Sequence, residues 1–323
     1  MATLMLAVRC SERASSALTE RLALLEQVRG LLPPTDLLYL LDIDRTTAVE
    51  ALNARLRRQP YVVDIGDDAG TLARGAGLSA SRVRGRQWVA RAVLHGSRAI
   101  VHRGYFHQLA LPPDRTSRPL FWAPDTVDDA CLDMPSPVER DSALVATFGS
   151  ITSDVPRASW PEFYGAELLD ILDEAPGVRG LVVLRGPGAD AFRRRAEERG
   201  LSARIEWHHD LPLEKLFALL RRASFVTSFQ TDDLTGWSRT TGKLPLALGA
   251  GCGLLTTAVG EASRVLPADQ MSSANRADFL SMCHRRIARG WSADDAARSR
   301  LAAERYRRSN VAASLVEFLE ALQ

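Results

Sequence analysis

The chain has 323 residues, of which 46% are hydrophobic and 25% are charged. This composition is typical of a soluble globular protein, and the length suffices for about two domains of roughly 150 residues each. The formal net charge of +2 excludes a bulk electrostatic case for binding nucleic acid or an anionic membrane. The N-terminus lacks the pattern of a signal peptide, and no run of about 18 apolar residues predicts a transmembrane helix.

The use of cysteine and of basic residues indicates the cellular compartment and the kind of genome that encodes the chain. The four cysteines are far apart and form no CxxC pair, which is typical of a reduced, cytoplasmic protein. Arginine and alanine are abundant, and Lys215 and Lys243 are the only lysines. That bias suggests a bacterial genome rich in G and C.

The first part of the chain alternates short apolar segments with amphipathic ones. Strands are expected at 35–44, 60–68, 98–105 and 118–125, and helices at 46–59 and 81–97. This rhythm predicts a parallel sheet covered by helices. The segment 126–142 is acidic, contains prolines and has no periodicity, so we interpret it as a hinge.

The second part repeats the rhythm more clearly. Strands are expected at 143–150, 179–188, 203–209, 224–229 and 252–260, and helices at 161–174, 189–201, 212–223 and 243–251, with a helical tail over 275–323. We therefore predict an α/β fold in which two Rossmann-like, doubly wound domains (1–125 and 143–300) face a cleft, followed by a C-terminal helix at 301–323. Ligands of such sheets bind beyond the carboxyl ends of the strands.

The stretch "SRTTGKLPLALGAG" contains a segment that is similar to the phosphate-binding loop of ATPases. A true phosphate loop of ATPases has four residues between its glycines and a Ser or Thr after the lysine. Here five residues separate Gly236 from Gly242, and Leu244 follows Lys243, so that interpretation fails. What remains is a loop entering a helix, where free N–H groups and the cations of Arg239 and Lys243 favour an anion. An ordinary helix cap with solvated charges is the alternative.

The segment "KLPLALGAGCGLLTT" resembles "KLfEYlAaGkPVVaT" of the GT-B glycosyltransferases, in particular the family 4-like retaining enzymes. Four further segments resemble family motifs in the same order: "RPLFWAPDTVDD", "ATFGSITSDV", "RGLVVLRGPG" and "ARIEWHHDLPLEKLFALLRRASFVTSF". The resemblance covers roughly residues 60–260. It implies a nucleotide-sugar donor held by the C-terminal domain, an acceptor held by the N-terminal domain, and no obligatory metal or other cofactor.

The resemblance also implies where the donor binds. Cations and N–H groups would stabilise the departing nucleoside diphosphate. The residues implied for the diphosphate are Gly149, Ser150, Arg157, Arg239, Thr240, Thr241, Gly242 and Lys243. Those implied for the base or sugar are Arg185, His208, His209, Asp232 and Asp233.

Several of these assignments have plain alternatives. Arg185 fits a surface arginine equally well, and the two aspartates fit a solvated turn. His208 and His209 are adjacent on a strand and point to opposite faces, so they cannot chelate one metal ion together.

On the acceptor side, the family's usual histidine falls at or beside Gly66. Asp67 is then the nearest candidate for acceptor activation or charge stabilisation, with helix capping as the alternative. His102 and His107 follow another strand and are possible acceptor-side residues or structural histidines. The N-terminal domain is short for the family. A second copy of the chain or a partner chain is therefore a candidate to complete the acceptor site.

The chain departs from the family at two further positions. Ser238 and Leu246 occupy places where the family usually carries glutamates that contact the donor sugar and the ribose. We therefore expect a cytoplasmic glycosyltransferase that moves a sugar from a nucleotide donor to a glycan, lipid or natural product. The alternatives are a degenerate GT-B subunit that binds nucleotide or a partner enzyme without catalysis, and a GT-B sugar-nucleotide epimerase or hydrolase.

Overall fold

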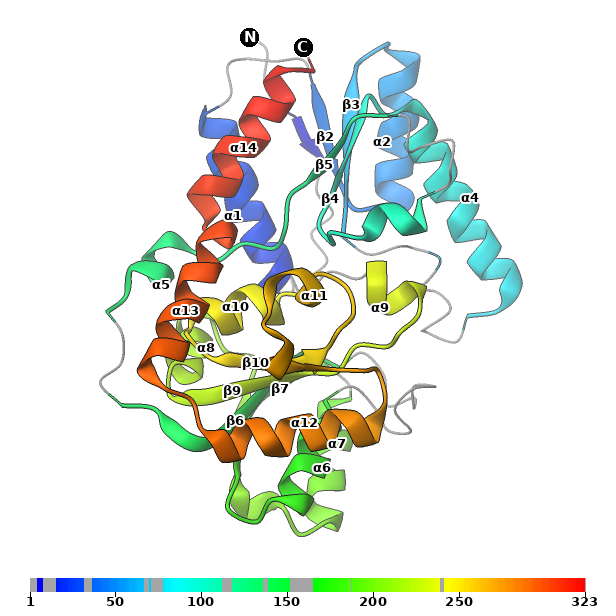
Figure 1. Cartoon of the computed structure of the whole chain (residues 1–323). Helices are drawn as coiled ribbons and strands as arrows, with labels where there is room; N and C mark the ends of the chain where they lie inside the picture. The colour runs from blue at the N-terminus through cyan, green and yellow to red at the C-terminus, as the bar shows by residue number, and fades with distance from the viewer. Residues whose placement is uncertain are drawn as a thin grey trace. The chain divides into compact units, whose positions relative to one another are not determined.

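The computed structural model of the chain (Figure 1) describes residues 5–7, 16–31, 37–66, 70, 78–111, 118–135, 139–151, 165–186, 188–238 and 241–322. The chain divides into two compact units. Unit 1 consists of Met1–Thr126, Asp233–Thr241 and Arg308–Gln323, and unit 2 of Val127–Asp232 and Gly242–Arg307.

Unit 1 contains a parallel sheet with the order β1-β2-β3-β4-β5. Its strands are β1 (Met5–Ala7), β2 (Leu38–Leu41), β3 (Tyr61–Ile65), β4 (Ala99–His102) and β5 (Leu120–Trp122). Every residue of β2, β3 and β4 is buried, as expected for parallel strands covered on both faces. Consecutive strands are neighbours, so the described part of this sheet contains no reversal of winding.

Helices cover both faces of this sheet. α1 (Ser16–Leu31) packs beside α14 (Arg308–Glu320), and α2 (Arg45–Leu56) packs beside α4 (Ala80–Gly96), as Figure 1 shows. Leu24 of α1 and Leu315 of α14 share a core with Tyr39, whereas Val93 of α4 packs with Leu40. The two clusters lie on opposite faces because neighbouring residues of a strand point in opposite directions. The short elements η1 (His107–Ala110) and α9 (Leu234–Ser238) complete the unit.

Unit 2 contains a six-stranded parallel sheet with the order β11-β10-β9-β6-β7-β8. Its strands are β6 (Asp141–Ser150), β7 (Arg179–Arg185), β8 (Ile205–His209), β9 (Ala223–Ser228), β10 (Gly253–Thr257) and β11 (Met271–Ser272). The chain starts in the middle at β6, adds β7 and β8 on one side, and returns to add β9, β10 and β11 on the other. This is the doubly wound Rossmann order, and it puts the topological switch point between β6 and β9.

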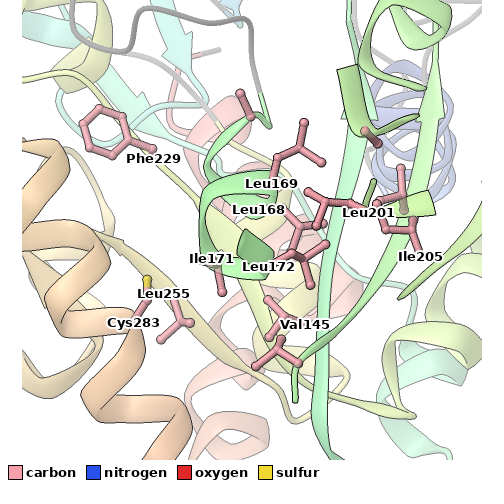
Figure 2. Close-up of a cluster of buried hydrophobic side chains, with 14 of the residues drawn as sticks. Val145, Leu168, Leu169, Ile171, Leu172, Leu201, Ile205, Phe229, Leu255 and Cys283 are labelled. Atoms are coloured by element: carbon pink, nitrogen blue, oxygen red, sulfur yellow. The ribbon is translucent and has the colours of Figure 1, made fainter. Parts of the chain in front are cut away.

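The helices of unit 2 are mostly short. They are α5 (Asp129–Asp133), α6 (Glu167–Glu174), α7 (Ala189–Glu198), η3 (Ser202–Arg204), α8 (Leu213–Leu220), α10 (Lys243–Gly249), α11 (Ala262–Val265), η4 (Ala268–Gln270), α12 (Arg276–Arg289), α13 (Ala293–Ala303) and η5 (Glu304–Tyr306). Figure 2 shows part of the core, where Leu168 and Leu172 of α6 lie near Val145 of β6, and Cys283 of α12 lies near Leu255 of β10. The two units together confirm the expected α/β fold with Rossmann-like domains.

The units divide the chain differently from the ranges expected from sequence. Residues 127–142, interpreted as a hinge, belong to unit 2, where Val127 forms a β-bridge with Arg307 and Leu132 O accepts a hydrogen bond from Arg300. The segment Asp233–Thr241 belongs to unit 1, where the ring of Trp237 packs edge-on against Phe106. Periodicity along the chain cannot show such contacts between distant segments.

Among the helices that the structure describes, none combines the length and the hydropathy needed to cross a bilayer.

The start of α13 provides a pH-dependent contribution to stability. Asp295 Oδ2 accepts a hydrogen bond from Ser292 N at 3.1 Å and lies 3.2 Å from the Arg286 guanidinium. Burial by itself raises the pKa of Asp295, but the hydrogen bonds from Ser292 and Arg286 outweigh it and lower the pKa to about 2. The unfolded chain has an Asp pKa of about 3.9, so this stabilisation is present above about pH 4 and is lost as the pH falls toward 2.

We therefore expect the melting temperature of the wild type to fall more between about pH 5 and pH 3 than that of Asp295→Asn. Calorimetric melting curves of both proteins at each pH measure the difference, which isolates Asp295 from the other carboxylates. An equal fall in the two proteins would contradict the assignment.

Candidate functional site

The candidate site of unit 2 begins where its two central strands part. β6 pairs with β9 as far as Ala146 and Val226, whereas its pairing with β7 continues to Ser150. The next residues, Thr147 and Thr227, therefore stand just beyond the last β6–β9 pair. In sheets of this order, the switch point is where ligands bind.

Lys243 places a positive charge at this point. It is the first residue of α10 and is 3% exposed. Its Nζ donates hydrogen bonds to Thr147 Oγ1 at 3.0 Å and to Thr227 O at 2.9 Å, and lies 6.0 Å from the centre of the Phe148 ring. The ammonium thus bridges the two strands where their ladder ends. All seven residues of α10 are buried, which holds the lysine in this position.

The loops after β6 and β7 are interlocked through their backbones. Ile151 N donates to Arg185 O at 2.9 Å, and Gly188 N donates to Ile151 O at 3.1 Å. Gly149 and Gly186 have φ angles of 135° and 89°, which side-chain-bearing residues rarely adopt. The glycines therefore let two strand-end loops approach closely beside the switch point.

Gly186→Ala is expected to disturb these loops. An added Cβ would stand 2.5 Å from Ile151 O, in a backbone conformation that is strained for alanine. We expect the free energy of unfolding to fall by about 1–3 kcal/mol, measured by urea denaturation. Gly177→Ala is the matched control, because its Cβ would meet nothing within 4 Å, and it should change stability little. Equal effects of the two substitutions would contradict this account.

Arg185, the last residue of β7, contacts the last residue of β6 and the residue that follows β8. Its Nε donates to Ser150 Oγ at 2.7 Å, and its NH1 lies 3.4 Å from Asp210 Oδ1. The structure therefore brings Ser150 and Arg185, two of the sequence-predicted residues, into direct contact beside the loops just described.

His208 and His209 project differently, as expected for neighbours on a strand. His208 Nε2 lies 2.8 Å from Glu206 Oε1, and Glu206 also accepts two hydrogen bonds from Arg222 at 2.9 and 3.0 Å. Those bonds from Arg222 lower the pKa of Glu206. His209 is exposed. His208 thus contacts a carboxylate that is already paired with Arg222. Among the described residues, no group of His, Cys, Asp and Glu could hold a metal ion.

The other residues predicted to bind the donor do not form one cluster in the described part of the chain. Gly242 precedes α10 with helical φ and ψ, and Thr241 is grouped with unit 1. Asp232 is exposed, and Asp233 Oδ1 accepts from Gly236 N at 2.9 Å at the start of α9. Outside the described residues lie Arg157, Arg239, Thr240 and the catalytic candidate Asp67.

Ser238 and Leu246, the two positions where the resemblance implies glutamates, are both buried. Ser238 Oγ donates to Leu234 O at 2.6 Å within its own helix. Leu246 is 7% exposed on α10. Neither side chain offers a carboxylate to a sugar or ribose.

The predicted acceptor-side histidines are buried in unit 1. His102 Nδ1 lies 2.9 Å from Gly104 O, and burial, the largest influence, lowers the pKa of His102. His107 is 1% exposed in η1. A buried, neutral imidazole at the end of β4 fits the structural alternative for His102.

A buried ion network, not anticipated from the sequence, lies near the carboxyl edge of the unit 1 sheet. Asp64 of β3 is fully buried and accepts hydrogen bonds from Arg21 Nε at 2.6 Å and from Tyr39 OH at 2.7 Å. Arg103 Nε lies 3.5 Å from the other oxygen of Asp64. An aspartate inside the apolar run "YVVDI" was the one signal in the sequence, but it does not identify the arginine partners.

Asp42 extends this network toward solvent. It follows β2 with a φ of 58°, and its Oδ1 accepts from Gly66 N at 3.1 Å and from the Arg103 guanidinium. Its side chain is 50% exposed. The structure therefore presents an anchored carboxylate at a strand end of unit 1.

Comparison with known proteins identifies the fold. The sequence matches no known protein-family model and no curated protein. The structure is similar to sucrose-phosphate synthase from Thermosynechococcus elongatus, with a TM-score of 0.63 and 12% identity over 89% of this chain and 74% of that one. It is also similar to a UDP complex of a mutant of S. aureus TarM, with a TM-score of 0.64 and 10% identity over 93% of this chain and 58% of that one.

A third similar structure is the pneumococcal O-GlcNAc transferase GtfA in complex with UDP and GlcNAc, with a TM-score of 0.61 and 12% identity. The match covers 94% of this chain and 60% of GtfA, so the chain spans about three fifths of the length of both TarM and GtfA. These likenesses establish that the chain has the GT-B fold, as the sequence motifs indicated.

Proposed function

We propose that this chain is a glycosyltransferase that binds the nucleoside diphosphate of a sugar donor at the switch point of unit 2. The observation that carries the proposal is the buried Lys243 ammonium, bonded to Thr147 and Thr227 where β6 and β9 part. The TarM and GtfA structures of the same fold contain UDP, which supports this choice of ligand.

The chemistry follows from the charge that develops on the leaving group. As the bond from the sugar to the diphosphate breaks, negative charge grows on the phosphate oxygens, and preorganised cations and N–H donors lower the barrier. We assign this role to Lys243, assisted by the Gly149–Ser150 and Gly186–Gly188 loops and by Arg157, Arg239 and Thr240. Arg185 would contact the donor next to Ser150. These side chains, rather than an obligatory metal ion, would neutralise the diphosphate.

Unit 1 would hold the acceptor, whether a glycan, a lipid or a natural product. The anchored carboxylate of Asp42 is suited to accept a hydrogen bond from an acceptor hydroxyl, because Gly66 and Arg103 fix one of its oxygens. Asp67 stays the proposed group for acceptor activation.

A second candidate is a degenerate GT-B subunit that binds nucleotide without transferring sugar. Leu246 is apolar and buried, and the Ser238 hydroxyl is bonded within its own helix. Both favour this candidate, because neither side chain can accept hydrogen bonds from the hydroxyls of a sugar nucleotide as a carboxylate would.

Calorimetric titration with UDP, GDP and dTDP, followed by a screen of nucleotide sugars for diphosphate release, tests the proposal. We expect one nucleotide to bind and its sugar to be transferred when acceptors are supplied. Binding without any turnover would favour the degenerate subunit, and turnover without an acceptor would favour an epimerase or hydrolase. Absence of binding by all three nucleotides would refute the donor-site assignment.

We also propose a reducing, cytoplasmic environment. Cys131, Cys252 and Cys283 are buried, and burial raises the pKa of Cys252 to about 11. Such unreactive thiols are typical of proteins kept in the cytoplasm.

A further inference from the structure

The outward faces of α2 and α4 expose large apolar side chains. Val49, Leu52 and Leu56 of α2 are 56%, 56% and 76% exposed, and Trp88 of α4 is 71% exposed. The three α2 residues follow the spacing i, i+3, i+7, which places them along one stripe of the helix. Because Ala51 of the same helix is buried against the sheet, the stripe points away from the core. Figure 1 shows the two helices side by side.

The same two helices are strongly basic. In α4, the exposed arginines are Arg82, Arg84, Arg86 and Arg91, and the helix contains no aspartate or glutamate. Exposed Arg55, Arg57 and Arg58 stand at the end of α2, whose single acid is Glu50. α2 and α4 therefore carry a local excess of positive charge, although the net charge of the whole chain is only +2.

We propose that this surface, the α2–α4 face, docks on an anionic lipid bilayer. Basic side chains near a charged membrane surface each add to binding, and apolar side chains standing among them can enter the boundary between headgroups and acyl chains. Tryptophan prefers that boundary, where its ring is partly apolar and partly wet. Arg84 and Arg91 lie on the same side of α4 as Trp88, at i−4 and i+3, so charge and aromatic ring face one surface together.

A bilayer fits both features better than other anionic partners. A nucleic-acid backbone would pair with the arginines but would leave the aliphatic stripe of α2 in water or against phosphate. An anionic bilayer offers phosphate at its surface and hydrocarbon just beneath it, which matches cations interleaved with apolar side chains. The proposal concerns unit 1 alone and does not depend on the donor site in unit 2.

Flotation of the full chain with vesicles tests the proposal. We expect binding to vesicles that contain phosphatidylglycerol, weakening as salt is raised, and little binding to pure phosphatidylcholine. Arg84→Glu/Arg91→Glu should lower partitioning at least about 30-fold. The double variant Arg194→Glu/Arg285→Glu makes the same change in net charge on exposed residues of unit 2 and should leave partitioning within about twofold of the wild type.

The apolar stripe has its own matched pair. Leu56→Ser should lower partitioning about fivefold, whereas Leu301→Ser, at a residue of unit 2 that is 75% exposed, should not. Failure to bind phosphatidylglycerol vesicles at low salt, or equal losses in both charge variants, would overturn the proposal. Loss with the arginine variant but not with Leu56→Ser would overturn the bilayer assignment in favour of a soluble anionic partner such as an acidic protein.

Discussion

Lys243→Met is expected to weaken binding of the nucleoside diphosphate about 100-fold. Removing one partner of a buried, hydrogen-bonded charge pair costs about 2–5 kcal/mol, and this range brackets a 100-fold change. Methionine keeps the apolar stem of the lysine and removes the ammonium that reaches Thr147 and Thr227. The measurement is calorimetric titration with the nucleotide that binds the wild type.

The chain supplies a matched control for this experiment. Lys215 is the other lysine of the sequence and is exposed on α8, so Lys215→Met should leave nucleotide affinity unchanged. Lys243→Met also loses the hydrogen bonds to Thr147 and Thr227, and we expect the free energy of unfolding to fall by about 1–3 kcal/mol. Circular dichroism of both variants establishes that they are folded. A folded Lys243→Met protein with wild-type affinity would show that the ammonium is purely structural.

Asp64→Ala is expected to destabilise unit 1 by about 3–5 kcal/mol. The substitution leaves the guanidinium of Arg21, which is 2% exposed, without its carboxylate, and an uncompensated buried charge is costly. It also leaves the hydroxyl of Tyr39 without its acceptor. Urea-dependent hydrogen exchange of peptides from β2 and β3 reports this unit specifically, because those strands carry the network.

Two further proteins separate the buried charge from other effects. The double variant Arg21→Met/Asp64→Leu removes both charges of this pair and should recover part of the lost stability, because an apolar pair of similar size can replace a buried ion pair. Tyr39 and Arg103 still lose the Asp64 carboxylate in this variant, so recovery is incomplete. Glu198→Gln removes an exposed partner of Arg195 and should change stability by less than about 0.5 kcal/mol. If Asp64→Ala were as mild as Glu198→Gln, the network would contribute little to the fold.

Local pattern determined much of the fold. Alternation of apolar strands and amphipathic helices located β2 to β10 and most of the helices between them, because side-chain periodicity is a property of neighbouring residues. The order of weak motifs also indicated the GT-B fold, which the structural comparison confirms. In unit 2, the structure brings Ser150 and Arg185 into contact at the ends of β6 and β7, and their role in binding a donor stays a prediction.

The sequence by itself therefore located most strands and helices and indicated the fold class. Only the tertiary structure decided that the Lys243 ammonium enters the gap between β6 and β9, that Arg21 meets Asp64, and that Trp237 packs in unit 1. Arg21 and Asp64 are 43 positions apart, and Lys243 and Thr147 are 96 apart. Such contacts depend on strand order and helix packing, which periodicity along one chain does not encode.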